Sequence, residues 1–350
     1  MQPIASHTLK LYLLDTNHIS EKSVRLLSLT IKPSTSVPPP LSSVPPLSSN
    51  TSPPFSLLLL FDRTIFHPQG GGQPSDKGQI FFKNKVFSII DVIYDKEKEL
   101  IYHKIEAFEG WQEFFGWKEV KEEECKKEEG GKEEGREQGE NEEERGKEGG
   151  VKKNGGRREG ENKGEDLLFD LEVEKERRIM NARLHSAGHL IDSGVKKACL
   201  DWVAGKGYHF EDSPYVEYIG KPVSDMEAIR KKIELECNLL IQQEKSSSQF
   251  LFLDPSSPLP PPPFSSSSPP SSFSPSLSSS FPSPPSSASL LLPKTLRWVR
   301  LFDGDEGCPC GGTHVRSVKE IGGVEITKIA KKGKNVRVSY KLKDGVEKMI

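Results

Sequence analysis

Two pairs of side chains with the same spacing suggest that this chain binds a metal ion. In RLHSAGHLID, which begins at Arg183, His185 and His189 lie four residues apart. Much later in the chain, in GCPCGGTHVR, Cys310 and His314 have the same separation. Zinc takes imidazole nitrogen and thiolate sulphur in tetrahedral sets, and three histidines with one cysteine make an ordinary set. The four side chains are therefore candidate zinc ligands.

Each pair alone is weak evidence for a metal site. Histidines four residues apart arise often by chance, and two of them can simply face solvent on the polar edge of a helix. A cysteine in a glycine-rich turn is often no more than a small buried residue. Finding both pairs in one compact part of the chain raises the joint odds. Cys308 lies two residues before Cys310, and spacing alone leaves it open as a competing ligand.

A helix is expected to carry the two histidines. From Glu176 to about Cys199, apolar residues recur three and four positions apart, which predicts one buried stripe that starts at Met180. His185 and His189 lie beside this stripe, and their spacing places them on the same face of the helix. A glycine-rich loop would supply the other two side chains.

Residues 167–350 are predicted to form a two-layer α+β domain. A strand, LLFDLEVE, opens this part at Leu167, and Ser224 with Glu227 makes a capping box that should start a second helix. The segments LRWVRLFD, GVEITKIA and NVRVSYKL have the pattern of strands. Helices packed on one face of an antiparallel sheet give this architecture.

Residues 1–118 are predicted to form a small antiparallel β-barrel. Five segments alternate with period two and are rich in β-branched and aromatic residues: LKLYLL, SVRLLSLT, LLLLFDRTIF, QIFFKNKVFSIIDVIYD and ELIYHKI. Closure into a barrel would leave few free edges. Three consecutive glycines, Gly70, Gly71 and Gly72, would let another chain or a ligand approach the backbone closely.

Three low-complexity tracts interrupt these two parts. Residues 32–55 and 245–293 are rich in serine and proline, and residues 119–166 are rich in glutamate, lysine and glycine. Such sequences bury too little apolar surface to offset the entropy of ordering them. We expect two disordered insertions in surface loops and, at 119–166, a disordered charged linker.

Composition excludes several classes of protein. A formal net charge of -2 over 350 residues predicts neither a nucleic-acid binder nor a membrane-surface protein, so RNA contacts would come from a local basic patch. The longest apolar runs fall far short of the roughly 20 residues that a membrane helix needs. Five scattered cysteines and the lack of a secretory signal favour a soluble, cytoplasmic protein.

The motifs HSAGH and CGGTH, preceded by GGGQPSDKG in an all-β segment, resemble those of the free-standing alanyl-tRNA editing (AlaX) proteins. These are relatives of the editing domain of alanyl-tRNA synthetase. GKGYHFEDSPYVEYIG and HVRSVKEIGGVEITKI are similar as well. The resemblance is to the medium-length form, which has a barrel, an editing domain and no long C-terminal extension. It covers nearly all of the chain outside the three tracts.

The resemblance implies a zinc-dependent hydrolase that removes serine wrongly attached to alanine tRNA, with glycine as a candidate second amino acid. It implies that the glycine-rich barrel segment approaches the same site, which places Gln73 and Thr64 near the substrate. Thr64 is the candidate to read the serine hydroxyl, although a β-branched residue in a barrel wall would explain it equally well. The implied zinc ligands are His185, His189, Cys310 and His314.

Two residues depart from the family pattern. His67 stands where a tyrosine is usual, so contacts that depend on that ring are open. Gly188, inside the histidine helix, replaces a residue that is usually larger. A glycine there costs the helix roughly 1 kcal/mol relative to alanine.

Four protein ligands would fill a tetrahedron and leave no obvious place for the attacking water. One solution is that a ligand, His314 being the best candidate, is displaced or that the ion becomes five-coordinate. In the other, zinc holds the amino group of the substrate while a neighbouring side chain activates water. The sequence does not separate the two.

The acceptor stem and mischarged 3′ end of alanine tRNA are the expected partner, with no ATP and no membrane involved. Two basic clusters could follow its phosphates, one on the histidine helix and one in a predicted hairpin turn. A solvated helix face and a charged turn would explain them as well. The candidates are Arg177, Arg178, Arg183, Lys331, Lys332 and Lys334.

Three other functions fit parts of the pattern. A zinc-stabilised tRNA-binding module without catalysis fits a closed set of four ligands. The editing domain of threonyl-tRNA synthetase has similar metal motifs but lacks the GGGQ barrel. A complete alanyl-tRNA synthetase would need more folded chain before the editing part than is present.

Overall fold

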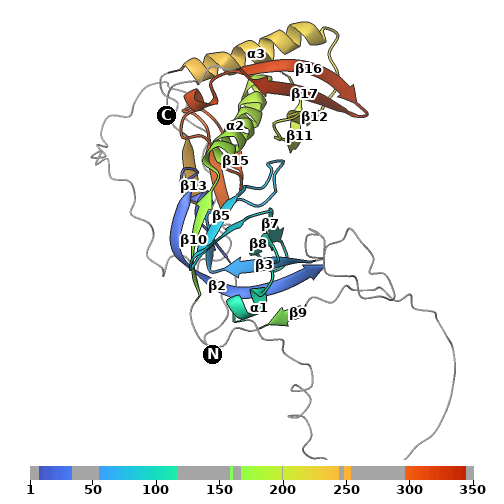
Figure 1. The fold of residues 1–350 in the computed structure, drawn as a ribbon. Helices are drawn as coiled ribbons and strands as arrows, with labels where there is room; N and C mark the ends of the chain where they lie inside the picture. The colour runs from blue at the N-terminus through green and yellow to red at the C-terminus, as the bar shows by residue number, and fades with distance from the viewer. Residues whose placement is uncertain are drawn as a thin grey trace, which may run out of the picture.

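The structure is a computed structural model, and it shows a mixed α+β protein built mostly of strands (Figure 1). A curled antiparallel sheet forms the N-terminal part, and a smaller sheet with two long helices lies beyond it. The predicted α+β class is confirmed at this level. Most of the three low-complexity tracts lies outside the described residues. The structure describes residues 8–33, 55–116, 158–160, 167–198, 200–243, 248–253 and 296–343.

The N-terminal sheet follows the strand order β6-β5-β10-β2-β3-β8-β7, with β9 also paired to β2. Its inward side chains form one apolar core that includes Leu57, Leu59, Phe61, Ile80 and Phe169. No pairing joins the end strands β6 and β7 among the described residues, so closure of the barrel stays a prediction. The strands are β2 (Ser20–Pro33), β3 (Phe55–Phe61), β5 (Gly78–Phe82), β6 (Lys85–Ser88), β7 (Asp91–Asp95), β8 (Leu100–Glu106), β9 (Arg158–Gly160) and β10 (Leu168–Val173).

Several predicted boundaries are corrected. The segment LKLYLL gives only β1 (Leu9–Lys10), which pairs with β4 (Arg63–Thr64), and then a 3-10 turn at Leu11–Leu13. The Asp15 carboxylate accepts a hydrogen bond from the Asn17 backbone N–H, which is typical of a turn and ends the extended segment here. The tracts were also drawn too wide, since β2, β3, β9 and β13 reach into them. In β13 (Gln249–Leu253) the sequence QFLFL is apolar enough to pair.

Strand β10, expected to open the second part, pairs with β2 and β5 of the N-terminal sheet. Helix α2 (Lys175–Lys197) follows after a single residue, Glu174, whose N–H donates to the Lys77 carbonyl. In Figure 1, α2 continues from β10 toward α3. The helix that carries both histidines is therefore anchored at its start in the N-terminal sheet.

A buried ion pair clamps the first turn of α2. The side chains of Arg178 and Asp76 are fully buried, and the guanidinium donates to the carboxylate at 2.5 Å. It also donates to the carbonyls of Thr16 and Ile65, at 2.9 and 2.6 Å. Arg178 therefore has no surface to offer an RNA phosphate, and the prediction of RNA binding is corrected for this residue.

The second sheet has the strand order β11-β12-β17-β16 and packs against α2 and α3 (Met226–Gln242). Its inward side chains, among them Val216, Val338 and Tyr340, join the apolar residues of both helices in one core. The cap of α3 is Asp225, whose carboxylate accepts from the N–H of Ala228 at 2.9 Å, and not the predicted Ser224. The strands are β11 (Val203–Tyr208), β12 (Tyr215–Ile219), β16 (Val324–Lys332) and β17 (Asn335–Leu342).

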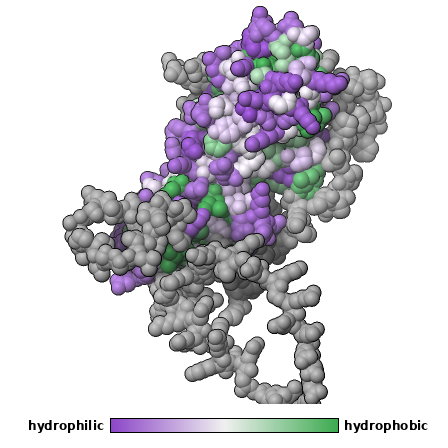
Figure 2. Space-filling view, turned by 90° about the vertical axis from the view of Figure 1, so that its right-hand side faces the viewer, coloured by the Kyte–Doolittle hydropathy of each residue, from purple (hydrophilic) through white to green (hydrophobic). Residues whose placement is uncertain are grey.

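Three short strands complete the described fold and bring the cysteine loop to α2. Strands β13, β14 (Leu296–Arg300) and β15 (Cys308–Pro309) form a small antiparallel sheet. A short helix, α1 (Trp111–Phe114), and a 3-10 helix, Val318–Ile321, are the remaining elements. In the part of the chain that is described, no helix has the length and hydropathy to cross a membrane. Figure 2 faces the side toward which the β16–β17 hairpin projects, and the surface there is mainly hydrophilic.

Replacement of Arg178 with alanine is expected to lower the free energy of unfolding by about 3–5 kcal/mol, because it leaves the Asp76 carboxylate buried and unpaired. Urea unfolding measures the change. Lys196→Ala is the matched control, because its 2.7 Å pair with Glu306 is exposed and should contribute less than about 1 kcal/mol. Equal, small losses in both variants would contradict the clamp.

Candidate metal centre

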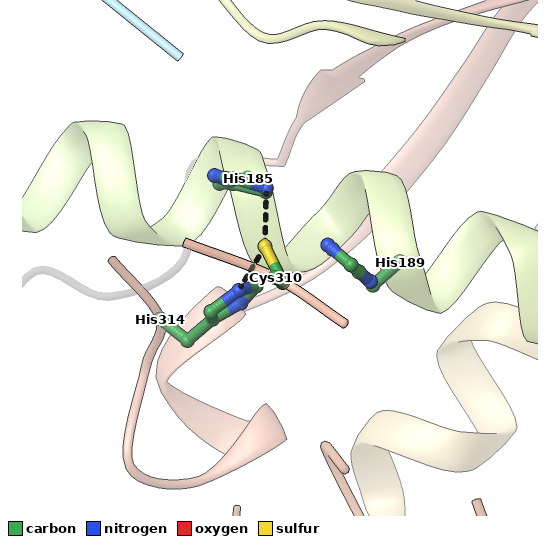
Figure 3. Close-up of side chains that lie close together, drawn as sticks. All are labelled: His185, His189, Cys310 and His314. Carbon is green, nitrogen blue, oxygen red and sulfur yellow. Dashed lines mark hydrogen bonds between the residues drawn. The ribbon is translucent and has the colours of Figure 1, made fainter. Parts of the chain in front are cut away.

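The four predicted ligands converge on one point. The donor atoms of His185, His189, Cys310 and His314 all lie within 4.8 Å of one another. The histidines of α2 face the loop after β15, which carries the other two side chains (Figure 3). The Cys310 sulphur lies 3.4 Å from Nε2 of His185 and 3.3 Å from Nε2 of His314. This group could hold a metal ion.

Hydrogen bonds at Nδ1 orient two of the rings. Because the Thr313 N–H donates to Gln73 Oε1, that oxygen is an acceptor, and His185 Nδ1 donates to it at 2.7 Å. His314 Nδ1 lies 3.1 Å from the hydroxyl oxygen of Ser186. With Nδ1 engaged in this way, Nε2 of each neutral ring is left as the donor to a metal.

Cys308 lies outside the cluster and contacts the third ring. Its sulphur is 3.2 Å from Nδ1 of His189. The four ligand atoms that meet do not include this sulphur. The group that could hold a metal thus includes Cys310, whereas Cys308 is placed to orient the His189 ring.

The protonation states of the cluster suit metal binding. Burial holds the pKa of His185 and His314 well below its usual value, so both rings are neutral. Burial alone would raise the pKa of the Cys310 thiol, but His189 and the Gly312 N–H outweigh it and the pKa falls. A metal requires neutral imidazole and thiolate, which the surroundings of these three side chains favour.

The pKa of His189 moves the other way. Burial lowers it, but the charge of Cys310 and the contacts with Cys308 outweigh that effect and hold the pKa well above its usual value. The imidazolium form of His189 is therefore stabilised by the two sulphurs. A cation at Nε2 would take the place of that proton, so metal binding should release it.

Close approach of the loop to the helix depends on glycine. A Cβ at Gly312 would lie 2.0 Å from Cε1 of His185 and 2.9 Å from Oε1 of Gln73. A Cβ at Gly188 would lie 2.3 Å from Cε1 of His209, whose ring stacks on His185 with centroids 4.9 Å apart. Gly188, which departs from the family pattern, therefore makes room for His209.

Gln73 lies where the resemblance placed it, beside the cluster. It is fully buried, and besides accepting from His185 it donates through Nε2 to the Thr313 hydroxyl at 2.9 Å. Its side chain thus joins the glycine-rich segment, α2 and the cysteine loop.

His314 is also buried, and its N–H donates to the Thr16 hydroxyl at 3.1 Å. These bonds favour His314 as a fixed ligand and not as one that is displaced.

Thr64 lies inside the N-terminal sheet and is fully buried. Its hydroxyl is 2.7 Å from Nε2 of His103 and accepts from the N–H of Phe66 at 3.0 Å. None of the hydrogen bonds of the described residues joins it to the four candidate ligands. His67, the other departure from the family pattern, is buried with its ring edge against Tyr12.

The remaining basic candidates differ in their surroundings. Arg177 donates to the Ser75 carbonyl and Arg183 to the Ile321 carbonyl, at 3.2 and 3.0 Å, so both also serve the fold. The three lysines at the β16–β17 turn are exposed. Of the six candidates, these three alone are exposed, as a side chain that contacts an RNA backbone should be. They are Lys331, Lys332 and Lys334.

The sequence did not single out Ser186, Thr313 or His209 as parts of the site. Ser186 accepts from the Val315 N–H as well as contacting His314, and so ties α2 to the loop. Each of the three lies inside one of the motifs HSAGH, CGGTH and GYHFED, and that position is the only feature of the sequence that could have marked it as part of the site. Hydroxyls beside metal ligands commonly orient them.

Comparison with known proteins supports the resemblance. Residues 299–337 match the threonyl and alanyl tRNA synthetase second additional domain. The chain is 25% identical over 286 residues to the alanyl-tRNA editing protein AlaX-L of Pyrococcus horikoshii. The resemblance to the alanyl-tRNA editing proteins is confirmed. The match covers 79% of this chain and 49% of that editing protein, so the chain spans about half the length of its curated relative. The medium-length, free-standing form stays a prediction.

The two cysteines beside this centre should respond differently to substitution. Cys310→Ala removes a ligand and should abolish stoichiometric binding of Co²⁺, together with the sulphur charge-transfer absorption of the bound ion. Cys308→Ala should keep that absorption and weaken binding about 10- to 100-fold, because it frees one ring to rotate. Titration against a chelator measures both. A charge-transfer band that survives Cys310→Ala but not Cys308→Ala would reverse the assignment.

Proposed function

We propose that this chain hydrolyses misacylated tRNA, chiefly serine attached to alanine tRNA and with glycine as a second candidate, at a bound zinc ion. The observation that carries the proposal is the cluster of three imidazoles and one cysteine sulphur, two of them buried and two half-buried, beside the GGGQ segment. The similarity to an alanyl-tRNA editing protein supports the substrate. The reaction consumes only water, so no ATP is required.

Zinc suits these donors, since imidazole and thiolate in a tetrahedral set are its usual protein ligands. The residues that would hold it are His185, His189, Cys310 and His314. When bound, zinc would supply a Lewis acid that holds the substrate amino group or polarises the ester carbonyl and bound water.

The protein itself supplies preorganisation. Gln73 holds His185 and Thr313 in place, and Ser186 does the same for His314 and Val315. Because these bonds are buried, no reorganisation is needed when the substrate arrives, which is how a rigid site lowers an activation barrier.

Thr64 is proposed to read the serine hydroxyl. The Nδ1 of His103 faces the Leu59 carbonyl, so its Nε2 accepts the Thr64 proton, and burial lowers the pKa of His103 to about 4, which keeps the ring neutral. With a further bond from the Phe66 N–H, one lone pair of the Thr64 oxygen remains. A serine hydroxyl that reaches this buried oxygen would donate to that lone pair, whereas alanine and glycine have no hydroxyl to donate.

Mischarged serine on alanine tRNA, incubated with micromolar protein, tests the activity. Serine should be released, and both a chelator and Cys310→Ala should abolish the release. Lys196→Ala, which removes an exposed charge far along α2, is the matched control and should retain the activity. Tight tRNA binding without release would favour a non-catalytic zinc-stabilised module, the second candidate that a closed ligand set fits.

Removal of the Thr64 hydroxyl tests the specificity. Thr64→Val should lower serine release by about 10-fold or more and leave glycine release within a few-fold, because only serine uses the remaining lone pair. The two substrates are compared as kcat/KM in parallel assays. Equal loss with both would assign Thr64 to the wall of the sheet.

A further inference from the structure

One face of the second sheet carries stacked aromatic rings. Side chains alternate along its strands, so Val216 and Val338 point into the core while Tyr215 and Arg337 lie on the opposite, partly exposed face. Helices α2 and α3 cover only the inner face. The outer face is therefore a surface of a four-stranded antiparallel sheet that the described elements leave open.

Three rings and one guanidinium form what we call the aromatic platform: Tyr208, Phe210, Tyr215 and Arg337. The ring of Tyr208 stacks on Phe210 at 4.4 Å and on Tyr215 at 5.3 Å, with interplanar angles of 12° and 14°. The Arg337 guanidinium lies 3.8 Å from the Tyr215 centroid. Among the described residues, no other ring stacks on Phe210. The row can therefore be extended at that end.

Polar contacts hold the platform in one arrangement. The Tyr208 hydroxyl donates to Asp212 at 3.4 Å, and Arg337 donates to Glu217 through Nε and Nη2, at 3.0 and 2.6 Å. These bonds fix the planes of the outer groups, so a ligand that stacks on them meets a preformed surface. Because Glu217 pairs with its charge, Arg337 contributes to the platform mainly by stacking on Tyr215.

Charged side chains of both signs lie around the platform, with the exposed acids Glu211 and Asp212 directly after Phe210. Lys206 is exposed two positions before Tyr208, on the same side of β11. The exposed lysines of the β16–β17 turn lie at the other end of the sheet, beyond Arg337, because Asn335 pairs with Ile219 whereas Ser339 pairs with Tyr215. The hydrophilic surface on this side of the molecule is the one that faces the viewer in Figure 2. Stacked, partly exposed rings with an arginine on one face are a surface on which unpaired bases can stack.

The platform is next to the candidate metal centre. His209 lies between Tyr208 and Phe210 in the sequence but points to the other side of the strand, where its ring stacks on His185. Strand β11 is an edge strand, so the two sides are separated only by its width. An RNA strand whose 3′ end reaches the metal centre can therefore place the nucleotides before that end near the platform.

We infer that the aromatic platform stacks the unpaired bases at the 3′ end of tRNA and so holds the aminoacyl end at the metal centre. The identity of the RNA rests on the proposed function. The stacking surface itself rests on the exposed rings. Phe210 is the position at which a base would add to the row.

The test uses uncharged RNA minihelices with and without the unpaired 3′ nucleotides, so that no hydrolysis is involved. Phe210→Ala and removal of the nucleotides should each weaken binding roughly 5- to 100-fold, and together hardly more than either alone. Phe210→Trp should restore the affinity. Tyr94→Ala is the matched control, since Tyr94 is a partly exposed ring under Lys10 in the other sheet. Fluorescence anisotropy at one salt concentration gives the dissociation constants.

Wild-type affinity in Phe210→Ala, or binding that does not depend on the unpaired nucleotides, would overturn the inference. An unchanged unfolding temperature shows that each variant is folded. Because the probe carries no ester, the result is independent of catalysis. Binding that depends on the unpaired nucleotides, without serine release, would contradict the proposed hydrolysis but support the role of the platform.

Discussion

A single buried amide connects the parts of the candidate metal centre. Gln73 accepts from His185 and from the Thr313 backbone through one oxygen, and donates to the Thr313 hydroxyl through its nitrogen. The helix, the glycine-rich segment and the cysteine loop come from distant parts of the sequence, yet this side chain contacts all three. Gly72, with φ of +81° and no room for a Cβ beside Gly207, lets the segment come close enough. This side chain therefore helps to set the position of His185 relative to the cysteine loop.

The fold supports that junction through α2. The helix begins directly after β10, a strand of the N-terminal sheet, and its first turn is clamped by Arg178 and Asp76. Asp76 also accepts from the His67 N–H at 2.6 Å, three residues before the first glycine of the segment. The same carboxylate therefore fixes both the helix and the segment that carries Gln73. The geometry of the site and the stability of the fold share this one interaction.

The sequence identifies the four side chains that cluster because the signal within each pair is local. Spacing of four residues in a helix or a tight loop reports a shared face, and the expected helix over 176–199 agrees with Lys175–Lys197 to within two residues. It predicts sheet partners poorly, since pairing of β10 with β2 and β5 is decided by tertiary packing and not by order along the chain.

Charge on a helix is equally ambiguous from the sequence. Arg178 has the same local context as Arg177, but only Arg178 meets a buried carboxylate, supplied by a segment a hundred residues away. The partners Ser186, Thr313 and His209 have no spacing rule of their own, so only the folded chain identifies them. The aromatic platform is likewise a product of strand register, because Tyr208 and Tyr215 are cross-strand partners.

X-ray absorption of the zinc-loaded protein tests the central claim most directly. One zinc per chain, with three nitrogens at about 2.0 Å and one sulphur at about 2.3 Å, is the predicted result. A shell with two sulphurs, or with oxygen in place of sulphur, would contradict the account, as would a purified chain that retains no stoichiometric zinc.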